Sequence, residues 1–136
     1  MMKLFLLGAA ALHALFMVFE LFPWSTPFSL QLASSKLPKL PASHLLTDDQ
    51  EKFFAARQRL TATAVHNAGI YNGIVAGGLS WAALAGNSAI DVAWVMLIGA
   101  TVAGAFGTVT LKSGVTAFQA LVGIIGLVLV WKCAAM

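Results

Sequence analysis

The sequence predicts an all-α fold: a membrane-spanning four-helix bundle with a long first loop that contains an amphipathic helix. Of the 136 residues, 60% are hydrophobic and only 10% are charged, whereas soluble domains are about 45–50% apolar and about 25% charged. A soluble domain of this length cannot bury so much apolar surface, but lipid can cover it. Four separate apolar stretches also have the length that crosses a bilayer.

The four stretches run over residues 4–22, 60–84, 90–109 and 115–131. At 1.5 Å per residue, about 17–25 residues cross a hydrocarbon core about 30 Å thick. The links after the second and third stretches are only a few residues long, so those helices are expected to be antiparallel neighbours. Residues 1–136 are then a single integral membrane domain.

A cleaved signal peptide is the alternative reading of the first stretch. Lys3, an apolar run and small residues fit that pattern loosely. The run continues to Phe22, beyond the hydrophobic region of a typical signal peptide. We therefore expect this stretch to remain as a span.

The loop of residues 23–59 has two parts. Its first half is kept extended or turned by Pro23, Pro27, Pro38 and Pro41. Thr47 and Gln50 then have the spacing of a capping box, which predicts a helix start. The following residues are amphipathic, and no helix breaker occurs before Gly69, so this helix is expected to continue into the second span.

The basic residues predict the orientation in the membrane. Six of the eight Lys and Arg fall in the long loop and at Lys112, and only Lys3 and Lys132 lie on the other side. The positive-inside bias therefore puts the long loop in the cytoplasm. The basic residues form no dense patch with exposed aromatics, so nucleic-acid binding is not expected.

Small residues recur every four positions in two spans and predict close helix contacts. In the second span they are Gly69, Gly73 and Gly77. In the third they are Gly99, Ala103 and Gly107, with Ala100 and Gly104 alongside.

Two ionisable residues in the first span need an explanation, because a charged side chain in hydrocarbon costs on the order of 2.5–3.5 kcal/mol. His13 lies near the middle of the span, and Glu20 follows seven residues later. Seven residues make about two turns, so both lie on one face, about 10 Å apart along the axis. They can line one groove at different depths.

Further polar residues fall in the same leaflet as Glu20: Asn67, Tyr71, Asn72, Thr108 and Gln119. Arg57 projects near Asn67 and Tyr71 if the helix is continuous. The opposite leaflet is nearly devoid of polar groups, so we expect a polar pocket that opens toward the long loop. The alternative is structural: Glu20 pairs with Arg57, and the amides tie helices together at roughly 0.6–2 kcal/mol each.

No metal or cofactor is expected. His13, His66 and Glu20 lack the paired spacing of a metal site, and the single Cys133 cannot form a cysteine cage.

Several of these residues also carry a family resemblance. The run from Ala11-Leu12-His13 to Glu20-Leu21-Phe22-Pro23-Trp24 resembles the first-helix pattern of the bacterial membrane family called domain of unknown function 1304. Asn67-Ala68-Gly69-Ile70-Tyr71-Asn72-Gly73 resembles its second-helix signature, residues 102–110 its third-helix run, and Phe118-Gln119-Ala120 the glutamine region of its fourth. The resemblance covers all four spans in order. Ala68 stands where the family usually has glutamine, and the insertion of residues 29–41 is longer than usual.

The resemblance implies a four-helix protein of the bacterial inner membrane with no settled activity, although some relatives carry an epimerase label. With the polar residues, it favours a pocket for a small, largely apolar molecule. There Glu20 and His13 would do acid–base chemistry of an isomerase or epimerase type, and Tyr71, Asn67 and Gln119 would orient the ligand. One alternative is a small proton-coupled carrier of the multidrug type, in which a homodimer places two Glu20 carboxylates around one cavity. Another is a structural subunit of a membrane complex.

Overall fold

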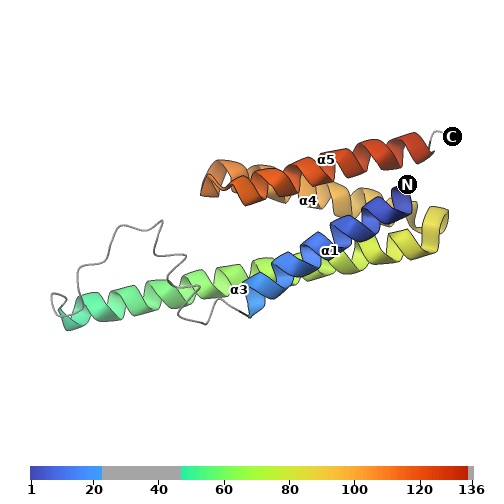
Figure 1. The fold of residues 1–136 in the computed structure, drawn as a ribbon. Coiled ribbons are helices and arrows are strands. Elements are labelled where there is room, and N and C mark those ends of the chain that lie inside the picture. Colours follow the sequence, from blue (N-terminus) through green and yellow to red (C-terminus); the bar gives the residue numbers. More distant parts are fainter. Residues whose placement is uncertain (23–46, 135–136) are drawn as a thin grey trace. The chain divides into compact units, whose positions relative to one another are not determined.

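The described chain is α-helical, which confirms the all-α class (Figure 1). The computed structural model describes residues 1–22 and 47–134. Helix α1 covers Met2–Leu21, α3 Asp48–Ala85, α4 Ile90–Leu111 and α5 Gly114–Ala134, and a short 3₁₀ turn, η3, covers Gly86–Ala89. Helices α1, α4 and α5 begin and end close to three of the predicted apolar stretches, whereas α3 begins twelve residues before the second stretch, 60–84. The proline-rich part of the long loop lies outside the described residues.

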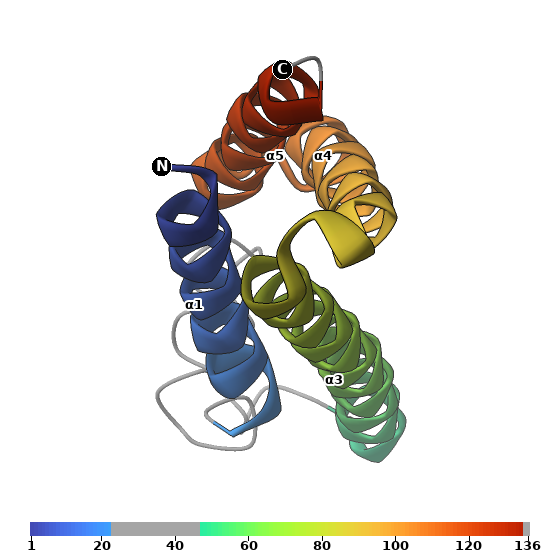
Figure 2. The ribbon, with the colours of Figure 1, turned by 90° about the vertical axis from the view of Figure 1, so that its right-hand side faces the viewer.

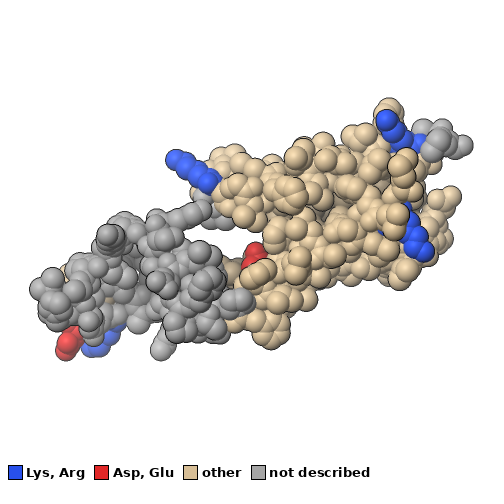
Figure 3. Space-filling view, viewed as in Figure 1, with Lys and Arg blue, Asp and Glu red and all other residues tan. Residues whose placement is uncertain are grey.

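Within the described residues, three stretches are long and apolar enough to cross a bilayer: Met2–Leu21, Ala62–Thr110 and Gly114–Ala134. The middle stretch has 49 residues and contains the turn η3. Many large apolar side chains on α4 and α5 are exposed, among them Val95, Val102, Phe106, Ile124 and Val128. On the face drawn in Figure 3, charged side chains are sparse among the described residues. This apolar exterior suits lipid contact and indicates a multi-pass membrane protein.

The predicted capping box at the start of α3 is confirmed. The Thr47 backbone N–H donates to Gln50 Oε1 at 3.0 Å, and the Gln50 backbone N–H lies 3.4 Å from Thr47 Oγ1. These contacts satisfy two backbone donors that the first turn would otherwise leave without partners. The prediction that this helix continues into the second apolar stretch is also confirmed, because α3 runs unbroken over 38 residues.

The chain reverses between α3 and α4 at η3, where Gly86 has a φ of +65° that a side chain would strain. The Ser88 hydroxyl donates to the Ala85 carbonyl at 2.9 Å, which satisfies one carbonyl at the end of α3. The link between α4 and α5 is shorter still. Lys112 adopts the left-handed conformation, with φ 49° and ψ 41°, and α5 begins at Gly114.

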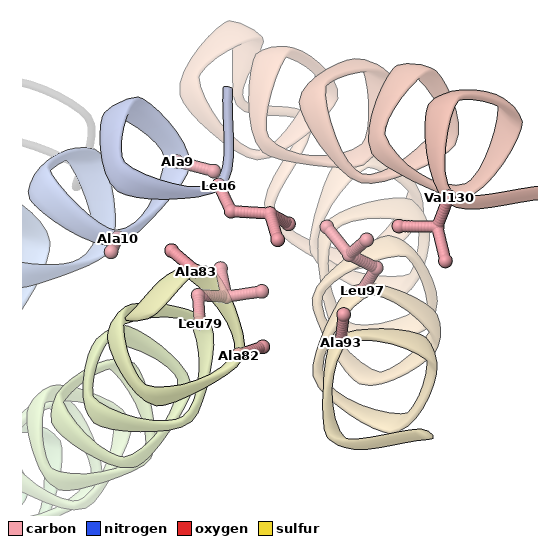
Figure 4. Packing of buried hydrophobic residues seen from close by; sticks show 9 residues of the cluster. All are labelled: Leu6, Ala9, Ala10, Leu79, Ala82, Ala83, Ala93, Leu97 and Val130. Atoms are coloured by element: carbon pink, nitrogen blue, oxygen red, sulfur yellow. The ribbon is translucent and has the colours of Figure 1, made fainter. Parts of the chain in front are cut away.

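The chain divides into two compact units, one made of Met1–Leu15 with Asn72–Met136 and the other of Phe16–Tyr71. The core of the first unit takes residues from four helices (Figure 4). Leu6, Leu79 and Leu97 point toward one another at its centre, and they are at most 1% exposed. The remaining core residues are small or β-branched: Ala9, Ala10, Ala82, Ala83, Ala93 and Val130. Because alanine adds little bulk, the helix backbones can approach closely.

Helices α4 and α5 lie side by side in both ribbon views (Figures 1 and 2). The buried positions of α4 follow one another at spacings of four and three: Ala93, Leu97, Ala100, Gly104 and Gly107. This is the spacing of knobs-into-holes packing. A Cβ on Gly104 would lie 2.5 Å from the Ala120 backbone nitrogen, so the two backbones meet there.

The predicted stripes of small residues are partly wrong in register. Gly107 lies at the α4–α5 contact, where a Cβ would come within 2.7 Å of the Thr116 side chain. Ala103 is exposed, and a Cβ on Gly99 or Gly77 would meet nothing within 4 Å. The positions named alongside the stripe, Ala100 and Gly104, are the buried ones. Both faces of these helices are apolar, so composition does not distinguish the packed face from the lipid face.

Within the second unit, the end of α1 packs against α3 at Gly69. A Cβ on Gly69 would lie 3.0 Å from Leu21 Cγ and 3.1 Å from Glu20 Cβ. Gly69 is buried, so the prediction that it makes a helix contact is confirmed.

Candidate functional site

A buried hydrogen bond joins His13 of α1 to Asn72 of α3 in the first unit. The Nδ1 of His13 and the Oδ1 of Asn72 are 2.7 Å apart, and the two side chains are 1% and 9% exposed. An amide oxygen only accepts, so Nδ1 carries the hydrogen and donates it. In that tautomer the neutral ring keeps Nε2 as its acceptor atom.

These two side chains are the buried polar ones in the part of the chain that the structure describes. They lie within apolar spans, where removing one partner would remove this buried hydrogen bond from the other. Both residues were predicted to belong to the pocket, and the structure brings them together.

One predicted site residue, Thr108, lies at the contact between α4 and α5. The Thr108 hydroxyl donates to the Gly104 carbonyl at 2.7 Å and lies 3.4 Å from Thr116 Oγ1. Gln119 is half-buried on α5. The hydroxyl of Thr108 therefore satisfies backbone and neighbouring hydroxyl groups within this helix pair.

The second unit holds the other predicted residues. Glu20 is half-buried, and its Cβ packs toward Gly69. Asn67 is exposed, and Tyr71 is 70% exposed. Arg57 lies on α3, and its side chain is outside the described residues.

His66, on the same helix, was considered from the sequence only as a metal ligand. Its Nε2 atom is buried and has no hydrogen-bond partner among the described residues. Buried polar atoms of this kind are normally hydrogen-bonded to the protein, to water or to a ligand. The sequence signal for this atom was only the presence of a histidine in an apolar helix. No three His, Cys, Asp or Glu side chains come together to hold a metal ion within residues 1–22 and 47–134.

An apolar groove in the first unit was not predicted. It has a volume of about 360 Å³ and is lined by Phe5, Gly8, Ala9 and Leu12 of α1 and by Phe118 and Val122 of α5. Its lining contains no polar side chain. The sequence signal for it is Gly8, a small residue in an otherwise bulky first span.

Comparison with known proteins gives a family and no characterised relative. A family model described as a protein of unknown function, DUF1304, matches residues 7–131. No curated protein and no solved structure shows significant similarity to the chain.

Proposed function

The chain belongs to the DUF1304 family of proteins of unknown function, and we propose that it is a four-span membrane protein that binds a small, largely apolar molecule at a site built around His13 and Asn72. The buried hydrogen bond between these two side chains carries the proposal. The turn η3 would divide the 49-residue apolar stretch into the second and third spans.

The energetics favour a functional histidine over a purely structural one. Hydrogen bonds between membrane helices contribute about 0.6–2 kcal/mol, and a serine or asparagine pair supplies this without an ionisable group. Ionisable residues inside a membrane are costly, and they usually mark ligand or proton pathways. A histidine that is almost completely buried between apolar helices therefore supports a role in binding or proton transfer.

The proposed chemistry is proton transfer without oxidation or reduction. The neutral imidazole of His13 would take a proton from a carbon atom of the ligand, and the resulting imidazolium would return a proton to it. Return of the proton to a different position or face of the ligand would be an isomerisation or epimerisation. Asn72, Thr108 and Gln119, which belong to the same unit as His13, would orient the polar end of the ligand or stabilise developing charge.

The test compares three variants in purified protein. His13→Phe keeps a ring of similar size but leaves Asn72 buried without this partner, which should cost about 1–3 kcal/mol. The double variant His13→Phe/Asn72→Leu removes both polar groups and should recover most of that stability. Thr110→Ala is the control, because Thr110 is exposed and its hydroxyl donates only to the Phe106 carbonyl of its own helix.

Native mass spectrometry of the wild type and the three variants then detects a co-purified small molecule. We expect the wild type and Thr110→Ala to retain it, and the double variant to lose it while its melting temperature stays near that of the wild type. A double variant that keeps the molecule would show that the histidine–asparagine pair only ties two helices together.

A proton-coupled carrier is the second candidate, and the close packing of Glu20 against Gly69 favours it. That contact places the Cβ of Glu20 where α1 meets α3, and a coupling carboxylate on this helix pair would respond to a bound cation. In proteoliposomes with an imposed pH gradient, Glu20→Gln should abolish accumulation of a lipophilic cation. Transport that persists in Glu20→Gln would eliminate the carrier.

A further inference from the structure

Two polar side chains lie on an exposed face of α3 inside an apolar span, and we propose that this face binds the same face of a second copy of the chain. Asn67 is exposed and Tyr71 is 70% exposed, and both belong to the second unit. They are four residues apart, so they lie on one face of the helix. This inference goes beyond the proposed function, which is carried by the buried pair of His13 and Asn72.

The depth of Asn67 and Tyr71 in the bilayer is set by the length of the span. The apolar stretch Ala62–Thr110 includes residues 62–85 of α3, which form a helix about 36 Å long. Its middle lies between residues 73 and 74, so Tyr71 is about 4 Å and Asn67 about 10 Å from the middle along the axis. A hydrocarbon core about 30 Å thick extends about 15 Å on each side of the middle. Both residues therefore lie at the depth of the hydrocarbon.

Lipid chains cannot satisfy the polar groups of this face. An exposed threonine hydroxyl can donate to its own helix, as Thr110 does to the Phe106 carbonyl at 2.9 Å. The Tyr71 hydroxyl stands at the far end of a rigid ring, and the Asn67 amide has two N–H donors as well as an acceptor oxygen. Neither side chain forms a hydrogen bond with another part of the described chain. Because an unpaired polar group is costly in hydrocarbon, a polar partner is expected to cover this face.

A second copy of the chain has the chemistry that this face requires. An amide and a phenol hydroxyl each have both a donor and an acceptor, so each can bond to its own kind. Two copies with the same orientation in the bilayer are related by a two-fold axis along the membrane normal, which puts equivalent residues at equal depth. The two Asn67 amides then face each other, as do the two Tyr71 hydroxyls. Ile70, which is 54% exposed, adds apolar contact beside them.

The experiment measures association of the purified protein by energy transfer in vesicles of phosphatidylethanolamine and phosphatidylglycerol. The chain has one cysteine, Cys133, so a donor or an acceptor dye attaches to each copy at one position. We expect energy transfer between copies that decreases as the protein is diluted with lipid, as a reversible dimer requires. Energy transfer no greater than that of randomly placed monomers at every dilution would overturn the proposal.

Variants of the exposed pair test whether this face is the interface. Tyr71→Phe removes only the hydroxyl, and Asn67→Leu replaces the amide by an apolar side chain of similar size. Each should weaken dimerisation about threefold to thirtyfold, which corresponds to the loss of one hydrogen bond between membrane helices. Both side chains are exposed, so the variants should keep the circular dichroism of the wild type.

Thr110→Ala is the matched control, because it removes an exposed hydroxyl that is already satisfied within its own helix. It should dimerise like the wild type. The His13→Phe/Asn72→Leu variant should also dimerise like the wild type, so failure of the ligand site and failure of the dimer are distinguishable. A double variant Asn67→Leu/Tyr71→Phe that dimerises as tightly as the wild type would contradict the assignment of this face.

Tyr71 also reports the contact directly, because it is the only tyrosine in the sequence. Photo-oxidation with a ruthenium sensitiser links tyrosine rings that touch, so a dityrosine link can form only between two copies. In the same vesicles we expect a covalent dimer with dityrosine fluorescence from the wild type and none from Tyr71→Phe. A wild type that dimerises without this link would place the interface on another face and refute the proposal.

Discussion

Replacing Gly104 by alanine should destabilise the protein through the contact between α4 and α5. The new Cβ would lie 2.5 Å from the Ala120 backbone nitrogen, 2.8 Å from the Thr116 carbonyl oxygen and 2.9 Å from the Ala120 Cα. Backbone atoms cannot rotate away as side-chain ends can. The two helices must therefore separate by about 1 Å to reach an ordinary contact distance of about 3.5 Å.

The expected magnitude follows from two opposing effects. Overpacking of a close contact costs typically about 1–3 kcal/mol. Alanine is a better helix former than glycine by about 1 kcal/mol, which offsets part of that cost. Gly104→Ala should therefore lower the free energy of unfolding by up to about 2 kcal/mol.

Gly99→Ala is the matched control on the same helix. A Cβ at Gly99 meets nothing within 4 Å, so this variant gains helix propensity without a clash. The assay is unfolding of the purified protein in mixed micelles by increasing mole fraction of denaturing detergent, followed by far-UV circular dichroism. If Gly104→Ala proves as stable as Gly99→Ala, the close backbone contact between α4 and α5 is refuted.

Three further predictions concern the ends of the helices. Lys112→Gly should stabilise the α4–α5 link by about 0.4–1 kcal/mol, because glycine adopts the left-handed conformation without strain; a lower unfolding midpoint in the same micelles would contradict this. Thr47→Ala should cost about 1 kcal/mol of local helix stability and speed amide hydrogen exchange in the first turn of α3, whereas unchanged exchange would mean that the capping box contributes nothing. In the proposed topology, a membrane-impermeant maleimide added outside intact cells should label Cys133, and Ser88→Cys in a Cys133→Ser background. It should not label Ser113→Cys in that background, and the reverse pattern would invert the topology.

The helices and their caps could be predicted because local chemistry determines them. The spacing of Thr47 and Gln50 specifies a reciprocal pair of hydrogen bonds within one turn, and both contacts are present. The chain reversal follows from a glycine next to polar residues, and Gly86 has the positive φ that such a turn uses. These features require no knowledge of what packs against the helix.

The packed faces could not be predicted from the same information. In a soluble helix the polar face identifies the solvent side, but α4 is apolar on every side. Gly99 and Gly104 are therefore equivalent in sequence, although one faces open space and the other meets a backbone. The hydrogen-bond partner of His13 could not be predicted either, because helical spacing relates residues on one helix and says nothing about the facing helix. Asn72 was one of several polar candidates.

The short link at Lys112 bears on how the protein enters the membrane. Helices α4 and α5 are joined by two residues and already contact each other through Gly104, Gly107 and Thr116. The hydroxyl groups of Thr101 and Thr108 in α4 donate to carbonyls of that helix, and the hydroxyl of Thr116 in α5 donates to the Ser113 carbonyl. These hydroxyl groups are therefore satisfied within the hairpin itself. Such a hairpin can leave the translocation channel as a preassembled pair. A lysine at its tip is costly to carry through the lipid and would therefore oppose translocation of this link.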